Sequence, residues 1–344
     1  QAPRLVMADG ERSLTRADAA DAALPAAGSV IAVLRRDLAL ALRLGGVATL
    51  GALLVVPSEL WFYPVDLTPD FWMMGLLYGL LGWAMIAVLA VFDRWDSRGW
   101  WIAAGLFGFL AEGLVVAELY GVLPFSILWT PLAWHAVVTV FLAFLWLRSR
   151  LARGAVAGAV ASAALGVALG VWNGWMWNVR EAADGSQSFD WQPLGPFAAQ
   201  VGIGWLVFVA GHWGWSRLGP RLMALNLKTD LWALTLLFGG LWAVSWLVPL
   251  FPWSLALPGL TVLSVWALRH AGRGDRHVPA TVSDRALLWT ALIPVCAIAT
   301  YATYTAARPT WEVNAYTVFI LGIPATLLWA RAHVPGRKNA VASD

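Results

Sequence analysis

The chain has 344 residues, of which 60% are hydrophobic and 12% are charged, and its mean hydropathy is +0.68. A soluble globular domain carries roughly 25% charged residues, so this composition excludes an ordinary soluble protein and predicts one embedded in lipid. The formal net charge is +3, but the basic residues lie in short clusters between apolar runs. That arrangement is typical of membrane topology and not of a nucleic-acid-binding groove.

Residues 1–37 are predicted to form a cytoplasmic or interfacial segment. A single transmembrane domain at 38–333 and a cytoplasmic tail at 334–344 are predicted to follow it. The apolar stretch 22–34 is interrupted by Pro25 and is too short to cross roughly 30 Å of hydrocarbon. No basic stretch precedes an apolar core here, so we expect no cleavable signal peptide.

Ten apolar segments follow, and each is bounded by charged residues, proline or glycine. They lie at 42–62, 70–92, 99–120, 124–147, 154–177, 193–216, 230–249, 252–268, 286–307 and 311–332. The eighth is short and contains Pro258 and Gly259, so nine spans and a re-entrant segment are an open alternative. We expect an all-α, polytopic transmembrane helix bundle of about ten transmembrane helices.

The basic residues favour an even number of crossings. If the first helix starts in the cytoplasm, the even-numbered loops and both termini hold every lysine and arginine except Arg180 and Arg308. Cytoplasmic loops of membrane proteins carry an excess of Lys and Arg, and the loss of one span would reverse every later loop. The sequence therefore predicts that the N-terminus and C-terminus are cytoplasmic, in a bacterial-type inner (plasma) membrane.

Two ionisable residues inside predicted spans, Glu112 and His135, are the strongest candidates for a functional site. A charge in the hydrocarbon costs roughly 2.5–3.5 kcal/mol on insertion scales, so such residues are rare. At a rise of 1.5 Å per residue, Glu112 lies roughly 12 Å and His135 roughly 16 Å below the outer boundary. The tight connection at 121–123 predicts that their helices are antiparallel neighbours. We predict that the pair acts as catalytic acid and base, with a structural clasp as the alternative.

Five further residues are predicted to bind the substrate in the outer half of the membrane: Glu118, Trp134, Asn173, Gln200 and Glu312. Glu118 also fits an interfacial carboxylate that contacts water. The 24 tryptophans predict an aromatic belt and core packing. An aromatic-lined pocket for a sugar, a cation or a flat apolar ligand is the alternative interpretation.

A carboxylate beside an imidazole stabilises the protonated ring and orients it, which gives a general acid–base couple. The sequence contains no phosphate loop, nucleophile elbow, HExxH motif or dinucleotide fingerprint. Glu112, Glu118 and His135 resemble a partial metal site. Because a His-rich spacing is missing and Cys296 is the single cysteine, we predict no metal site and identify no cofactor.

One short region resembles membrane carotenoid hydratases, which carry an acid, a Pro-Phe pair and a PLxW-type segment. The resembling residues are Glu112-Gly113, Leu123-Pro124-Phe125-Ser126 and Trp129-Thr130-Pro131-Leu132-Ala133-Trp134-His135. The spacings differ, and the resemblance covers less than a tenth of the chain, so no family is assigned from it.

These observations predict an integral membrane protein with an outward-facing, polar and Trp-rich pocket. It would act as an enzyme on a hydrophobic or lipid-linked substrate through Glu/His acid–base chemistry. Two alternatives stay open: a proton-coupled small-solute transporter that uses the same pair, and a structural or pigment-associated subunit in which His135 or His212 ligates a porphyrin-type ring. The expected partners are membrane lipids and a hydrophobic or lipid-linked small molecule, and not nucleic acid. The residues alone do not decide between enzyme and non-enzyme, and they do not determine the cofactor or the oligomeric state.

Overall fold

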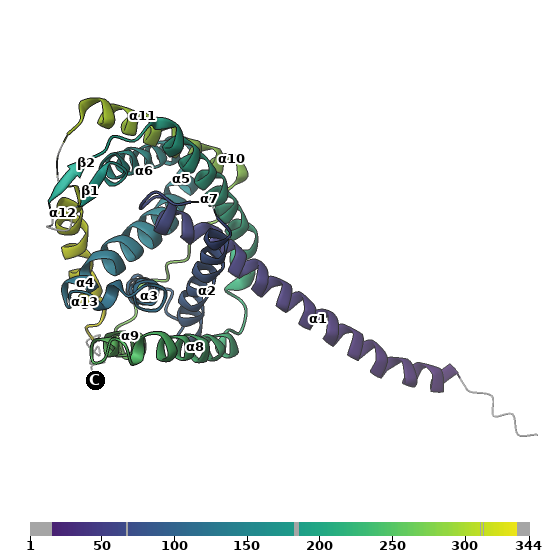
Figure 1. The fold of residues 1–344 in the computed structure, drawn as a ribbon. Coiled ribbons are helices and arrows are strands. Elements are labelled where there is room, and N and C mark those ends of the chain that lie inside the picture. The colour runs from purple at the N-terminus through teal and green to yellow at the C-terminus, as the bar shows by residue number, and fades with distance from the viewer. Residues whose placement is uncertain (1–15, 67, 182–185, 310, 312, 336–344) are drawn as a thin grey trace, which may run out of the picture. The chain divides into compact units, whose positions relative to one another are not determined.

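The computed structural model describes residues 16–335 apart from residues 67, 182–185, 310 and 312 (Figure 1). The chain divides into two compact units, residues 1–44 and 45–344. In the first unit, the described residues belong to helix α1 (Arg16–Val55). This helix begins well before the first expected span at 42–62, so the residues expected to lead into that span are helical as well.

Short helical segments continue one another along most of the second unit. Its α-helices are α2 (Pro69–Val91), α3 (Ser97–Leu110), α4 (Phe125–Ile127), α5 (Leu147–Arg153), α6 (Ala155–Met176), α7 (Leu194–Leu222), α8 (Lys228–Trp242), α9 (Ala256–His270), α10 (Asp284–Leu287), α11 (Leu292–Ala307), α12 (Val313–Thr317) and α13 (Ile323–Ala332). The π-helical segments are Val56–Leu60, Ala111–Val115, Leu128–Trp146, Ala243–Leu247 and Val318–Gly322, and the 3-10 turns are Glu118–Tyr120, Trp253–Leu255 and Leu288–Ala291.

The expected all-α class is confirmed, with one small exception. Strands β1 (Val179–Glu181) and β2 (Gln187–Phe189) form an antiparallel hairpin between α6 and α7, in which Val179 pairs with Phe189. Every one of the ten expected apolar segments overlaps a helix in the described part of the chain.

The described residues contain seven helices that are long and apolar enough to cross a membrane, so a multi-pass membrane protein is supported. They are Arg36–Leu60, Phe71–Val91, Phe125–Arg153, Ala155–Met176, Leu194–Leu222, Lys228–Leu247 and Asp284–Ala307. The expected spans at 99–120, 252–268 and 311–332 fall on shorter or interrupted helices. In the first of these, α3 ends at Leu110 and the chain becomes extended at Val116, so one continuous helix to residue 120 does not form.

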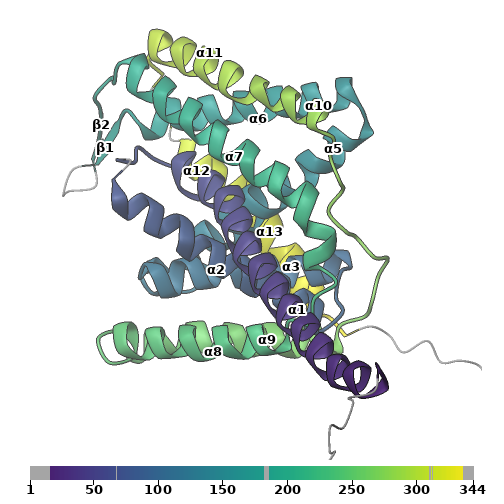
Figure 2. The same cartoon turned by 90° about the vertical axis from the view of Figure 1, so that its right-hand side faces the viewer.

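Glycines allow α6 to pack closely on α11, and the two helices lie side by side in both views (Figure 1, Figure 2). Gly166, Gly170 and Gly174 recur every four residues and so share one face of α6. A Cβ atom built on Gly170 would lie 2.5 Å from Cβ of Thr300 and 2.6 Å from the carbonyl oxygen of Ala297. Small residues at this spacing let membrane helices approach backbone to backbone.

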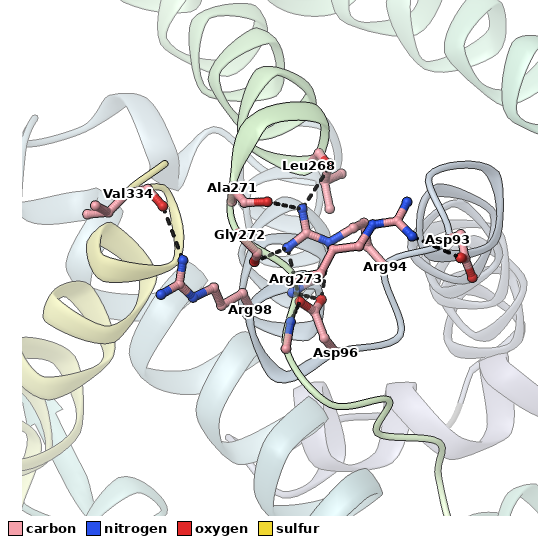
Figure 3. A network of polar contacts seen from close by, with 11 residues as sticks. Asp93, Arg94, Asp96, Arg98, Leu268, Ala271, Gly272, Arg273 and Val334 are labelled. Carbon is pink, nitrogen blue, oxygen red and sulfur yellow. Dashed lines mark hydrogen bonds and ion pairs between the residues drawn. The ribbon is translucent and has the colours of Figure 1, made fainter. Parts of the chain in front are cut away.

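A buried arginine in the loop between α2 and α3 caps the C-terminal end of α9 (Figure 3). Nη1 of Arg94 donates to the carbonyl oxygens of Leu268 (2.8 Å) and Ala271 (3.1 Å), and Nη2 donates to that of Gly272 (3.2 Å). The last carbonyls of a helix have no partner within it, and a cation there also complements the helix dipole. Asp96 binds the same guanidinium through both carboxylate oxygens, at 3.2 and 3.1 Å, so the charge of the buried arginine is neutralised.

Other contacts join the same group of loops, all of which the charge pattern assigns to the cytoplasmic side. The donor–acceptor pairs are Arg98 to the carbonyl of Val334, Trp100 to that of His277, Arg148 to that of Ala280, and Arg217 to the carboxylate of Asp284. Loops that are expected on one side of a membrane therefore meet at one end of this unit.

Candidate functional site

Glu112 and His135 form a buried pair. The Oε1 atom of Glu112 lies 2.6 Å from Nε2 of His135, and the two residues are 6% and 2% exposed. The other ring nitrogen, Nδ1, lies 3.2 Å from Oγ of Ser58, which in turn lies 3.1 Å from Oγ1 of Thr139. A carboxylate, an imidazole and a hydroxyl are thus connected in series, with each group within hydrogen-bonding distance of the next.

The members of this series all lie on π-helical segments. Ser58 is in Val56–Leu60, Glu112 is in Ala111–Val115, and His135 and Thr139 are in Leu128–Trp146. A π-turn adds a residue to a helical turn and so rotates the side chains that follow, and such turns are frequent at functional sites. The rings of Phe107 and Tyr78 lie 5.8 and 6.0 Å from the His135 ring, centroid to centroid, and shield it from water.

A second carboxylate, Glu59, belongs to the same cluster. It accepts hydrogen bonds from the hydroxyl of Tyr63, at 2.7 Å, and from the hydroxyl of Tyr78. It also interacts electrostatically with His135 and with Glu112. Burial, and then the neighbouring Glu59 carboxylate, raise the pKa of Tyr63, so this phenol stays protonated and donates. The second carboxylate is therefore held by two tyrosine hydroxyls beside the Glu112–His135 pair.

No role in the site was predicted from the sequence for Ser58 or for Glu59. The available signal was the polar sequence Pro57-Ser58-Glu59 at the end of an apolar run. The position of Glu59 near the end of the first expected span indicates that it lies near the outer boundary of the membrane. That position does not show which face of the helix meets His135.

The tryptophans form a cluster beside this site. Trp134, Trp172, Trp175 and Tyr304 are its buried members, and Phe62 is one of the partly buried residues that pack against them. The ring of Trp134 lies 4.5 Å from that of Phe62 and 4.8 Å from that of Trp172. Because Trp134 directly precedes His135 in the chain, the cluster borders the buried pair.

Three of the predicted substrate-binding residues bind the backbone at the end of the first span. Trp134 donates to the carbonyl of Pro57 (2.9 Å). Asn173 donates to that of Trp61 (2.9 Å), and Gln200 donates to those of Leu60 and Tyr63 (2.8 and 2.9 Å). Carbonyls at a helix end need partners from outside the helix, so each of these side chains stabilises this turn.

Of the other two predicted substrate-binding residues, Glu118 and Glu312, the structure describes only Glu118. Glu118 is exposed at the start of the 3-10 turn Glu118–Tyr120, and no hydrogen bond or ion pair between described residues links it to Glu112 or His135. Glu312 lies outside the described residues. Among the residues that the structure describes, no group of three or more His, Cys, Asp and Glu could hold a metal ion.

No protein-family model matches the chain, and neither the curated proteins nor the solved structures contain a match. The function must therefore be argued from the geometry of the site.

The two candidate pigment ligands have different surroundings. Both ring nitrogens of His135 lie within hydrogen-bonding distance of a side chain, so neither nitrogen is free to ligate the metal of a porphyrin. His212 is fully buried, and its Nδ1 lies 3.2 Å from Nη1 of Arg148, which donates to the His212 carbonyl at 2.9 Å. Arg148 also donates to Oγ of Ser216 (2.8 Å) and to the carbonyl of Ala280 (2.9 Å), so it joins its own helix to α7 and to the segment after α9.

Proposed function

We propose that this chain is a multi-pass membrane enzyme that transfers an acyl group from a hydrophobic, ester-type substrate. Ser58 would be the nucleophile, His135 the general base, and Glu112 the group that orients the imidazole. The observation that carries the proposal is the series Ser58 Oγ to His135 Nδ1 at 3.2 Å and His135 Nε2 to Glu112 Oε1 at 2.6 Å. A nucleophile next to a base that a third group orients is the general signature of an activated hydroxyl.

The chemistry follows from the positions of the protons. When Nε2 carries the proton and donates a hydrogen bond to the Glu112 carboxylate, Nδ1 is unprotonated and its lone pair faces Ser58. As Oγ of Ser58 attacks the ester carbonyl carbon, His135 takes the hydroxyl proton, and Glu112 stabilises the resulting imidazolium. Collapse of the tetrahedral intermediate breaks the ester C–O bond, and the leaving alkoxide takes the proton from His135. Water or an acceptor alcohol then releases the acyl group from Ser58 in the same way.

The substrate class is inferred from the surroundings. Ser58 and His135 lie in helices long and apolar enough to cross a membrane, so a substrate would reach them through lipid. We place Trp134 and the neighbouring aromatic rings along the path of the hydrophobic part of the substrate. Asn173 and Gln200 would hold the turn that carries Ser58 and Glu59, and Glu118 and Glu312 would lie nearer the outer surface.

We also propose ten crossings, with both termini on the cytoplasmic side of a bacterial-type inner membrane. This proposal is supported by hydrogen bonds between the predicted cytoplasmic loops. They join Arg98 to Val334, Trp100 to His277, and Arg217 to Asp284. Three crossings in this proposal use the shorter helices at α3, α9 and α13.

Labelling by an alkyl fluorophosphonate tests the proposed activity, because this probe bonds to an activated serine with loss of fluoride. The full chain in native-like lipid should be labelled, and Ser58→Ala should not be. Ser126→Ala is the matched control, because this half-buried serine lies outside the cluster, and it should label as the parent does. Ser58 and His135 are 2% exposed, so labelling also requires the helices to open. Absence of labelling, or equal labelling of Ser58→Ala, would mean that the series only clasps the helices together.

Proton-coupled transport is the second candidate, and the observation that favours it is the second carboxylate. Glu59 is buried, and among the described residues no basic side chain forms an ion pair with it. Its carboxyl group therefore carries either an exchangeable proton or a buried charge. Proteoliposomes loaded with a pH-sensitive dye and offered a panel of amino acids and sugars would acidify if a solute moves with a proton. Glu59→Gln would stop that acidification, whereas Ser58→Ala would not.

A further inference from the structure

A groove with a volume of about 760 Å³ lies at the turn between α5 and α6, away from the buried cluster. Its lining residues are Trp146, Arg150, Arg153, Gly154, Ala155, Val156, Ala157, Val160 and Ala161. The turn joins two helices that are candidate membrane spans, Phe125–Arg153 and Ala155–Met176. The groove therefore lies where the hydrocarbon of a membrane gives way to the headgroup layer.

The charge of the groove is positive and unbalanced. Among the described residues, no carboxylate forms an ion pair with Arg150 or Arg153. The Nε atom of Arg150 is buried and has no hydrogen-bond partner, and its guanidinium carbon lies 5.6 Å from the centroid of the Trp146 ring. A buried polar atom without a partner carries a free-energy cost, which an anionic oxygen bound beside it would remove.

Backbone groups add to this preference for an anion. Helix α6 begins at Ala155, directly after Gly154, and no side chain caps its first amide groups. The N-terminus of a helix attracts negative charge through its free N–H groups and its dipole. Gly154 has a φ of 137°, a conformation that only glycine adopts without strain, so the turn keeps this end of α6 open.

The opposite wall of the groove is apolar and exposed. Val156 is 79% exposed and Val160 is 64% exposed, and they lie four residues apart on one face of α6. A free inorganic anion would leave these side chains uncovered. A molecule with a phosphate at one end and a hydrocarbon chain at the other would satisfy both parts of the groove.

We propose that this groove binds an anionic phospholipid, with its phosphate between Arg150 and Arg153 and an acyl chain along Val156 and Val160. Basic pockets at the cytoplasmic ends of membrane helices recognise such headgroups. Trp146 would lie at the level of the ester groups, where tryptophan is enriched in membrane proteins. This site is independent of the proposed acyl transfer, because it shares no residue with Ser58, Glu112 or His135.

The test compares two lipids and three forms of the full chain in detergent. Fluorescent phosphatidylglycerol and phosphatidylcholine are titrated against the parent, Arg150→Gln/Arg153→Gln, and Arg221→Gln/Arg331→Gln. The control pair removes the same charge at exposed arginines near helix ends outside the groove. We expect the parent to prefer phosphatidylglycerol, and the groove variant to bind it about 30-fold more weakly, at roughly a fivefold loss for each arginine near a charged lipid surface. The control pair should bind as the parent does.

Three outcomes would overturn the proposal. These are equal binding of the two lipids by the parent, unchanged binding by the groove variant, and displacement of phosphatidylglycerol by inorganic phosphate at the same concentration. The last result would identify a site for a free anion. If the double variant does not fold, Arg153→Gln is the substitute, because this side chain is exposed, and it should bind about fivefold more weakly.

Discussion

Oε1 of Glu112 lies 2.6 Å from Nε2 of His135, across 23 positions of sequence and between two different helices. Because the pair is buried, removing one partner destabilises the protein, since the other is left as a buried polar group without a partner. The pair also fixes which nitrogen of His135 faces Ser58. Its chemistry can therefore be tested separately from its contribution to stability.

Glu112→Gln should slow the labelling of Ser58 by the alkyl fluorophosphonate by about 100-fold or more, in line with the usual size of general-base catalysis. The amide can still accept a hydrogen bond from Nε2, but it cannot neutralise an imidazolium. The measurement is the labelling rate at a fixed probe concentration, with the melting temperature followed in parallel. Glu181→Gln, at an exposed position of β1 outside the proposed site, is the matched control and should label at the parent rate. Equal slowing of both variants would contradict a specific role for Glu112.

Asp96→Asn should destabilise the protein at neutral pH, and the difference from the parent should shrink in acid. Burial alone would raise the pKa of the Asp96 carboxyl, but hydrogen bonds from Arg94 and from the backbone N–H groups of Gly274 and Gly99 hold the net pKa below its usual 3.8. A carboxyl group whose pKa is lower in the folded than in the unfolded protein stabilises the fold. This stabilisation is complete at a pH above the pKa of the unfolded state, and it is lost as the pH falls through the pKa of the folded state. Thermal unfolding in detergent from pH 7 to below pH 4 measures this.

The control for Asp96 is Asp93→Asn. Asp93 pairs with Arg273 at 3.4 Å on an exposed part of the same loop region. An exposed ion pair contributes about 0–1 kcal/mol, so this variant should unfold close to the parent temperature. A loss at Asp93 as large as that at Asp96 would mean that total loop charge, and not the cap on α9, stabilises this end.

Gly170→Ala should loosen the packing of α6 on α11. The new methyl group would meet Thr300 at 2.5 Å and the carbonyl of Ala297 at 2.6 Å, and overpacking of this kind costs about 1–3 kcal/mol. Gly202→Ala is the control in another helix, because a Cβ there meets nothing within 4 Å. That change should be neutral or stabilising by about 0.4–1 kcal/mol, and unfolding followed by tryptophan fluorescence would distinguish the two.

Gln200→Ala should destabilise the turn that carries Ser58. It would remove the donors to Leu60 and Tyr63 and the acceptor for the backbone N–H of Val65, at 3.0 Å. Each buried group left without a partner costs about 1–3 kcal/mol. Gln187→Ala, at an exposed position of β2, is the control. If Gln200 also binds substrate, the labelling rate of Ser58 should fall more than the melting temperature explains.

Much of the architecture was predictable because the hydropathy and charge of a segment depend only on its own residues, and not on residues far away in the sequence. The ten apolar segments all overlap helices, and Glu112 and His135 come together as expected, although the chain between them is a longer irregular connection and not a tight turn. The helix ends were less predictable. Breaks such as the one after Leu110 depend on local π-turns and on side chains from other helices, which a hydropathy average does not contain.

By itself, the sequence determined that the protein is embedded in lipid, roughly where its helices lie, and that Glu112 and His135 are buried. Only the tertiary structure decided that Ser58 and Glu59 join Glu112 and His135, and that Trp134, Asn173 and Gln200 bind the carbonyls at the end of the first span. The physical reason is that hydrogen bonds are directional and burial is not. Burial depends on composition over a whole segment, whereas a hydrogen bond requires two specific atoms about 3 Å apart, and their positions depend on the rotation of each helix against its neighbours.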